Sequence, residues 1–131
     1  MVKLYNTLTR QKDTLKPLDG KTVKIYTCGL TVYSQPHIGN WVGYVYWDIL
    51  IRLLRYEGLD VVRTQNITDV GHLTSDDDSG EDKMLKTARE RSMSVLEIAD
   101  FYTDAFFKDI DRLNIVRPDI ICKATEHIPD M

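Results

Sequence analysis

The stretch that most constrains the fold comprises residues 24–40, where a strand, a tight loop and the start of a helix follow one another. Residues 24–27 alternate polar with apolar or aromatic side chains, which is typical of a partly buried strand. Gly29 then permits a sharp turn that bulkier residues resist. Pro36 has a fixed φ angle and no N–H group, which suits a first helical turn, so we expect a helix to begin near His37.

The segment after this loop has helical periodicity between residues 38 and 57. Its apolar residues recur three and four positions apart, at Trp41, Val42, Val45, Ile49, Leu50, Leu53 and Leu54. This spacing predicts a helix with one buried stripe, and Gly58 is typical of a helix C-terminus. The valine-rich residues 59–66 predict a second strand. Together these elements predict a βαβ unit whose strands are parallel.

The second half of the chain is predicted to form an acidic loop and a helical segment. The acidic residues 76–78 lack the ligand spacing of a calcium-binding EF-hand loop, so we interpret them as a solvated turn before a helix over residues 81–91. A further helix is expected to open at Ser94, because Ser94 and Glu97 have the spacing of a capping box. Its expected apolar stripe contains Ala99, Tyr102, Phe106, Ile110 and Leu113.

These patterns predict an α/β fold, namely the first half of a Rossmann-like nucleotide-binding domain with parallel strands, followed by a helical insertion. We expect residues 1–70 to hold the βαβ half and residues 71–131 to hold the acidic loop and the helices. Residues 2–5 alternate weakly and predict a short edge strand, and residues 9–18 are polar. A chain of 131 residues can bury one ordinary core.

Composition excludes several classes of function for this stretch of sequence. The formal net charge is −3 and the basic residues are scattered, which argues against nucleic-acid binding by this stretch alone. Cys28 and Cys122 lie far apart in the sequence, and neither a signal peptide nor an apolar run of the ~20 residues that cross a bilayer is present. We therefore expect a cytoplasmic protein without a membrane partner.

The predicted topology brings several polar residues to one edge of the sheet. Parallel strands end at the same edge, so Cys28 and residues 66–69 are expected at a common crevice, where ligands bind in such folds. The helix N-terminus nearby favours an anion such as phosphate. His37 and Asn40 are three apart on one helical face, and Gly39 between them would let a ligand approach the backbone. The alternative is that His37 and Asn40 bond only to the loop.

The sequence TCGLTVYSQPHIGN at residues 27–40 resembles the motif of class I aminoacyl-tRNA synthetases, and among them that of the cysteinyl-tRNA synthetase family. That family joins a CGxTVY loop to a HIGH tetrapeptide. The resemblance covers nearly the whole chain, because further segments match in order at residues 5–10, 66–69, 113–115, 117–119 and 124–128. Asn40 stands where the tetrapeptide ends in His; its amide can donate hydrogen bonds but cannot carry a proton.

The resemblance implies ATP-dependent activation of L-cysteine to cysteinyl adenylate, followed by transfer to tRNA(Cys), with Mg²⁺ accompanying the ATP. Such chemistry depends on aligning two substrates and stabilising charge on phosphates, and it needs no protein nucleophile. The implied catalytic residues are His37 and Asn40, the implied ATP-binding residues are His37, Ile38, Gly39 and Asn40, and the implied cysteine-binding residues are Gly29, Thr31 and Thr68. The family's KMSKS loop has no counterpart in the 131 residues, so we expect the chain to be the amino-terminal part of a longer catalytic domain.

The resemblance also implies that Cys28 is one ligand of a Zn²⁺ ion that binds the thiolate of the substrate. A zinc–sulfur bond is unavailable to a serine hydroxyl, so such a site discriminates where apolar packing cannot. From position alone, a lone cysteine at a strand end such as Cys28 is more often a small buried residue than a ligand. The remaining zinc ligands are expected to lie outside this chain.

Two other functions compete with the tRNA ligase. An enzyme that activates cysteine and joins it to a small amino sugar, as in mycothiol biosynthesis, would share the zinc and HIGH residues. A non-catalytic nucleotide-binding or interaction module could keep the half-fold and lack the chemistry. Cysteine-dependent ATP–pyrophosphate exchange separates enzyme from module, and the acceptor separates the two enzymes.

Overall fold

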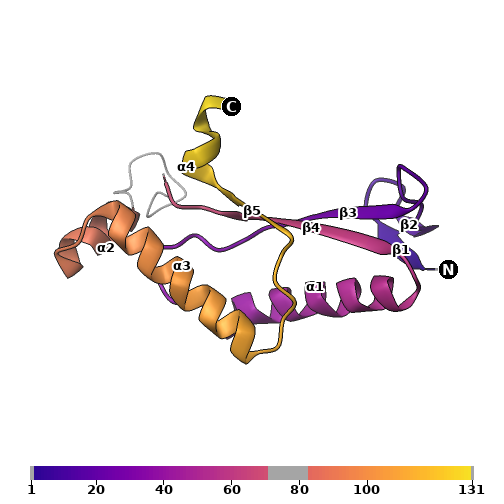
Figure 1. Ribbon diagram of the computed structural model, residues 1–131, viewed down its shortest axis with the longest axis horizontal. Coiled ribbons are helices and arrows are strands. Elements are labelled where there is room, and N and C mark those ends of the chain that lie inside the picture. Colours follow the sequence, from indigo (N-terminus) through magenta and orange to yellow (C-terminus); the bar gives the residue numbers. More distant parts are fainter. Residues whose placement is uncertain (1, 71–82, 131) are drawn as a thin grey trace.

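The computed structural model describes residues 2–70 and 83–130 of the chain (Figure 1). The strands are β1 (Lys3–Asn6), β2 (Gln11–Thr14), β3 (Thr22–Thr27), β4 (Asp60–Ile67) and β5 (Ile120–Lys123). The helices are α1 (Ile38–Tyr56), α2 (Lys83–Arg91), α3 (Val95–Arg112) and α4 (Ala124–His127), followed by a 3₁₀ turn over Ile128–Asp130. The predicted acidic turn lies outside the described residues. Within the described ranges no helix is long and apolar enough to cross a membrane.

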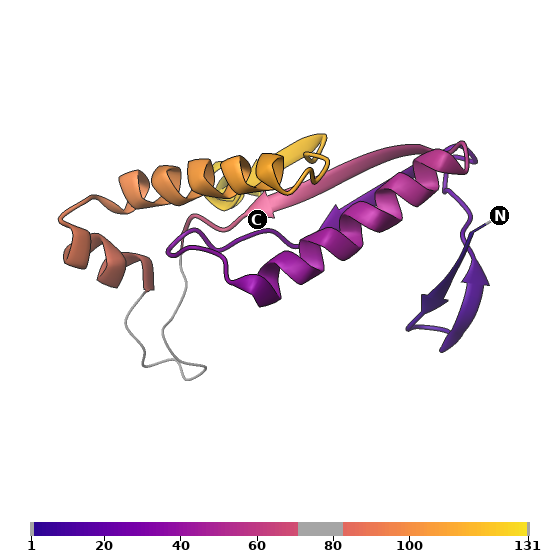
Figure 2. The same cartoon turned by 90° about the horizontal axis from the view of Figure 1, so that it is seen from below.

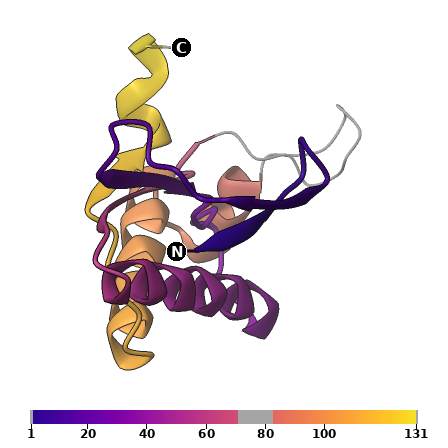
Figure 3. The same ribbon diagram turned by 90° about the vertical axis from the view of Figure 1, so that its right-hand side faces the viewer.

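The centre of the structure is a three-stranded sheet of order β3-β4-β5 with all strands parallel. Thr22 of β3 pairs with Asp60 of β4, and this register continues to Thr27 opposite Gln65. Helices α1 and α3 connect successive strands and lie on the same face of the sheet, whereas α4 projects from the opposite side (Figures 1 and 3). The predicted α/β class and the predicted parallel pairing of β3 with β4 are confirmed.

Two features of the sheets differ from the sequence-based expectation. Strand β5 adds a third parallel strand within the segment that was expected to hold only a loop and helices. It is four residues long and begins two residues after Pro118, which is too short for alternation to be recognised. Residues 9–18, expected to be merely polar, contain β2, which pairs antiparallel with the predicted strand β1. Backbone bonds and the Asn6 to Asp13 side-chain bond, 3.0 Å, hold this hairpin without an apolar pattern.

The buried stripe predicted for α1 is wrong at most positions. The residues of α1 that are buried are Tyr44, Asp48, Ile51 and Leu54. The expected core residues Val42, Val45, Ile49 and Leu53 are between 38% and 56% exposed and form an outward apolar row. Apolar side chains occupy nearly every side of this helix, so spacing alone could not select the inner one. Figure 2 shows the length of α1 beside α3 and the sheet.

A buried carboxylate explains the rotation of α1. Asp48 accepts a 2.8 Å hydrogen bond from the backbone N–H of Val116 and a 2.7 Å bond from Nε of Arg52. Val116 lies in the connection that leads to β5, which crosses close to α1. A buried carboxylate is tolerated only when it is hydrogen-bonded, so the long-range bond from Val116 helps to place Asp48 inward. Unlike the nearby Arg52, this partner could not be recognised from the local sequence.

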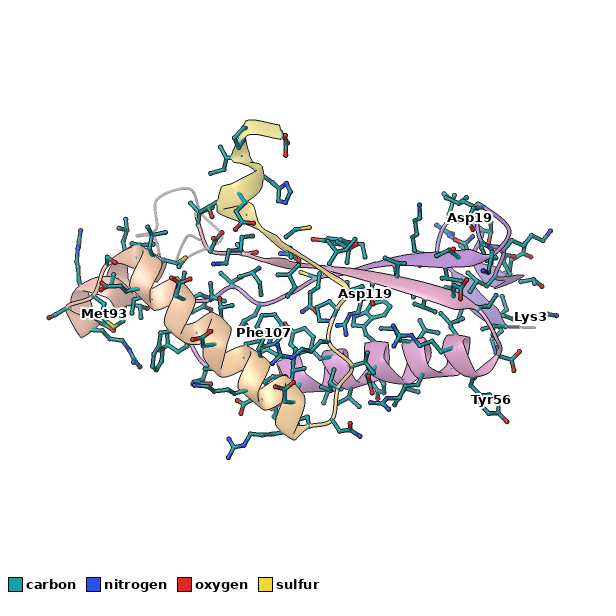
Figure 4. The ribbon with its side chains drawn as sticks, viewed as in Figure 1. Lys3, Asp19, Tyr56, Met93, Phe107 and Asp119 are labelled. Carbon is teal, nitrogen blue, oxygen red and sulfur yellow. The ribbon has the colours of Figure 1, made fainter. Side chains whose placement is uncertain are left out.

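Helix α3 agrees closely with the sequence-based expectation. Its N-terminus has the predicted capping box, with Ser94 accepting from the N–H of Glu97 and Glu97 accepting from the N–H of Ser94. Its buried residues are Ile98, Ala99, Tyr102, Phe106 and Ile110; Leu113 follows as the C-cap and is 49% exposed. Phe106 stacks on Trp41 of α1 with ring centroids 5.5 Å apart. The labelled Phe107 of α3 lies toward α1 in Figure 4.

The face of the sheet that meets the helices carries an unusual buried cation. Arg63 of β4 is 1% exposed and donates to Thr27 Oγ1, Val116 O and Gln65 Oε1 at 2.9–3.2 Å. Desolvation lowers the pKa of this guanidinium, while Asp48, Tyr44 and Asp119 oppose the shift. The backbone of Arg63 bonds Asp119, which enters the sheet ahead of β5 (Figure 4). The polar groups on the helix-facing side of the sheet thus extend from Arg63 in the middle of β4 to Thr27 at the end of β3.

Two glycines of the α1 region should respond to alanine with opposite signs. Gly58 has φ +81°, so an alanine there would be forced into the left-handed region at a cost of about 1–2 kcal/mol. Gly43 lies within α1 with nothing near an added methyl group, so Gly43→Ala should raise the free energy of unfolding by about 0.5–1 kcal/mol. Urea unfolding of the purified chain measures both. A loss of stability in Gly43→Ala would contradict the helix as described.

Candidate active site

A pocket of about 180 Å³ opens where β3 ends and α1 begins. Its lining comes from the loop between them and from the first turns of the helix. The lining residues are Gly29, Leu30, Thr31, Tyr33, Ser34, Gln35, His37, Asn40 and Tyr44. Four of the sequence-predicted site residues, Gly29, Thr31, His37 and Asn40, therefore meet in one hollow.

The pocket wall exists because the loop after β3 presses against the end of β4. The N–H of Gly29 donates to Asn66 Oδ1 at 2.7 Å, and Asn66 Nδ2 donates to Thr68 Oγ1 at 3.0 Å. A Cβ atom added to Gly29 would lie 1.7 Å from the carbonyl oxygen of Asn66. Only glycine fits this contact. The carboxyl ends of β3 and β4 thus lie side by side as expected, but neither Cys28 nor residues 66–69 line the pocket.

A short bridge continues the pairing beyond both strands. Thr31 and Thr68 form an isolated parallel bridge, in which the Val32 N–H donates to Thr68 O and the Thr68 N–H donates to Leu30 O. Thr68 is thus adjacent to the pocket-lining Thr31, although its own side chain bonds to Asn66. The bridge fixes the position of the loop relative to the carboxyl end of β4.

His37 and Asn40 form a reciprocal cap at the start of α1. The Nδ1 atom of His37 accepts from the Gly39 N–H at 3.1 Å, and Asn40 Oδ1 accepts from the His37 N–H at 3.0 Å. A neutral imidazole that accepts at Nδ1 carries its hydrogen on Nε2. The bonded amide oxygen likewise leaves Asn40 Nδ2 as a donor, with no partner among the described residues. Two side-chain donors therefore remain for a ligand at the positive end of the helix dipole, whereas the backbone N–H groups of Gly39, Asn40 and Trp41 already bond to His37.

Ile38 and Gly39 have different surroundings from His37 and Asn40. The side chain of Ile38 is 80% exposed and lines a neighbouring hollow of about 320 Å³ together with Trp41 and the end of α3. A Cβ atom on Gly39 would come within 2.9 Å of the His37 ring. Gly39 therefore leaves room for the capping imidazole, which the sequence-based argument about ligand approach did not foresee.

Cys28 is exposed at the end of β3, outside the pocket lining, with its sulfur 3.7 Å from the carbonyl oxygen of Gly29. Cys122 of β5 is also a free thiol. Among the residues that the structure describes, no three His, Cys, Asp or Glu side chains gather where they could hold a metal ion. Cys28 can thus supply one ligand, and the described part of the chain does not complete a metal site.

Tyr44 is a pocket residue that the sequence analysis missed. It is 6% exposed, and its ring makes edge contacts with Trp41 and Phe106 at centroid distances of 5.5 and 5.1 Å. Burial raises the pKa of Tyr44 to about 12, the Cys28 thiol adds to the rise, and Arg63 opposes it. The spacing of residues 37, 40 and 44 along one helical face was the available signal.

Comparison with known proteins agrees with this architecture. The family model of the class I (C) tRNA synthetase catalytic domain matches residues 14–131. A cysteine–tRNA ligase of Treponema denticola is 58% identical over 130 residues, which is 99% of this chain and 26% of that protein. The ligases of Borreliella burgdorferi and Chlorobium chlorochromatii are 52% and 48% identical over 100% and 97% of the chain.

The chain spans about a quarter of the length of these curated relatives, 26% to 27% of each. The matched region contains the strand, loop and helix that build the pocket. Both the extent of the family match and the level of identity place the sequence in one group: the chain belongs to the family of class I (C) tRNA synthetase catalytic domains.

Proposed function

We propose that the protein carrying this chain activates L-cysteine with ATP and transfers the cysteinyl group to tRNA(Cys). The observation that carries the proposal is the pocket at the end of β3, lined by His37 and Asn40, in a chain of this family. The names of the relatives support cysteine as the amino acid and tRNA as the acceptor. In the activation step, the cysteine carboxylate attacks the α-phosphorus of ATP and pyrophosphate leaves.

His37 and Asn40 would act on the phosphates. His37 Nε2–H and Asn40 Nδ2 are donors whose other polar atoms already bond within the cap. Donors held in place before the reaction stabilise the negative charge that develops in the transition state. Ile38 and Gly39 would flank the nucleotide, and Mg²⁺ would arrive with ATP, held mostly by phosphate oxygens.

The amino acid would lie on the other side of the pocket. Gly29 and Thr31 line it directly, and Thr68 fixes the loop through its bridge to Thr31. Cys28 at the rim would be one ligand of Zn²⁺, since soft thiolates suit this ion. When bound, zinc would favour a thiol over the hydroxyl of serine. The remaining ligands would have to come from outside the described residues.

Substrate dependence tests the proposal in the full-length protein. ATP–pyrophosphate exchange should require cysteine and fail with serine, and the purified protein should charge tRNA(Cys). Exchange without tRNA charging, but with transfer to an amino sugar, would identify the small-molecule ligase instead. Absence of cysteine-dependent exchange would overturn the enzymatic function and leave the binding module.

Replacement of His37 should separate catalysis from helix capping. His37→Ala removes one preorganised donor, so the exchange rate should fall by about 10²–10³ while cysteine binding changes much less. The same change removes the α1 cap, which costs roughly 1 kcal/mol of stability. Serine is a good N-cap, so His37→Ser should recover that stability but leave the rate low.

Two variants complete this test. His127→Ala is the matched control, because His127 pairs with Asp130 near the end of the chain, away from the pocket lining. Asn40→His should be tolerated, since an imidazole can also donate to phosphate. The rate of ATP–pyrophosphate exchange measures the effect on catalysis, and thermal melting measures the effect on stability. A His37→Ser rate within twofold of wild type would remove His37 from the mechanism.

Zinc should bind weakly to the 131-residue chain and tightly to the full-length protein. A substrate-binding zinc site needs three protein ligands, and Cys28 supplies one. Zinc should therefore leave the Tm of the isolated chain unchanged, whereas folded-state binding at 100-fold over Kd would add about 2.7 kcal/mol. In the full-length protein, Cys28→Ser should lower zinc content and Cys122→Ser should not. Stoichiometric tight zinc in the isolated chain would show that the metal site is misplaced.

A further inference from the structure

The hydroxyl group of Tyr44 has no hydrogen-bond partner among the residues that the structure describes. A buried tyrosine ordinarily finds one. The fully buried side-chain nitrogen and oxygen atoms without partners in the described part are Gln65 Nε2 and Thr103 Oγ1, and the Tyr44 oxygen is not among them. The ring is therefore enclosed by Trp41 and Phe106, while the hydroxyl still reaches the space of the pocket that Tyr44 lines.

The position of Tyr44 along α1 indicates which end of the pocket it serves. His37 and Asn40 lie at the start of α1, where their side-chain donors and the positive end of the helix dipole favour an anion. Tyr44 is one turn deeper on the same face, and helical tyrosine side chains lean back toward the helix N-terminus.

The charges of the lining add a second constraint. Among the described residues that line the pocket there is no Asp or Glu. An amino acid carries an ammonium group, which needs hydrogen-bond acceptors when it leaves water. The side chains with hydroxyl groups in the lining are those of Thr31, Tyr33, Ser34 and Tyr44. Among them Tyr44 is the most deeply buried, and a contact with a charged group is worth most where water is excluded.

We propose that the Tyr44 hydroxyl oxygen accepts a hydrogen bond from the α-ammonium group of the bound amino acid. This assignment rests on the proposed function, because it takes cysteine as the ligand. Tyr44 would thereby hold the amino acid by its ammonium group while His37 and Asn40 hold the phosphates. The hydroxyl takes no part in bond making, so its contribution is to amino-acid affinity.

The test compares Tyr44→Phe with Tyr46→Phe in the full-length protein. Tyr46 is on the same helix and 68% exposed, so its change is chemically identical but outside the pocket. Tyr44→Phe should raise KM for cysteine about 10-fold, the effect of losing a hydrogen bond to a charged group, and leave KM for ATP within twofold. Its Tm should stay at the wild-type value, because the hydroxyl has no partner to lose among the residues that the structure describes. Tyr46→Phe should change none of these.

Two analogues identify the contacted group. 3-Mercaptopropionate is cysteine without its ammonium group, so its inhibition constant should be equal for wild type and Tyr44→Phe. Cysteamine keeps the ammonium and lacks the carboxylate, so its inhibition constant should rise in the variant. An unchanged KM for cysteine, or an equal loss for ATP or 3-mercaptopropionate, overturns the assignment. If wild type shows no cysteine-dependent exchange, the proposed function itself fails, and the assignment with it.

Discussion

The close approach of Gly29 to the carbonyl oxygen of Asn66 is the contact on which the site depends. It brings the loop after β3 down onto the end of β4, where Asn66 Oδ1 receives the Gly29 N–H at 2.7 Å. The bridge between Thr31 and Thr68 follows from that approach. With any larger residue at position 29 the loop would rise, and the pocket between the loop and α1 would lose one wall. The absence of a side chain at Gly29 therefore determines the position of the pocket-lining residues on the loop.

Beneath the pocket, the protein tolerates a charge in its interior. Burial of Arg63 is costly unless its donors are satisfied, and the neutral acceptors on Thr27, Gln65 and Val116 satisfy three of them. Thr27 directly precedes Cys28, so this network holds the last residue of β3 before the pocket loop. The arrangement joins three segments that are distant in sequence: the ends of β3 and β4 and the connection into β5.

The sequence predicted those parts of the fold that local chemistry controls. The α3 capping box, the parallel pairing of β3 with β4 and the helix start at His37 all follow from short patterns, and the structure agrees. The inward side of α1 did not follow, because Asp48 is buried through a bond to Val116, 68 residues away. Tyr44 was assigned neither to the core nor to the site from the sequence, because the loop that makes it part of a pocket is recognised only in the folded structure.

The cap at the start of α1 also has an entropic consequence. Each of His37 and Asn40 uses one polar atom to close the helix, which fixes its side chain while another atom faces the pocket. Their rotational freedom is therefore lost when the helix forms, before any ligand arrives. Immobilising such a side chain on binding costs roughly 0.5–1.5 kcal/mol, so the two together spare a ligand about 1–3 kcal/mol. The residues that cap the start of α1 thereby also contribute to binding affinity.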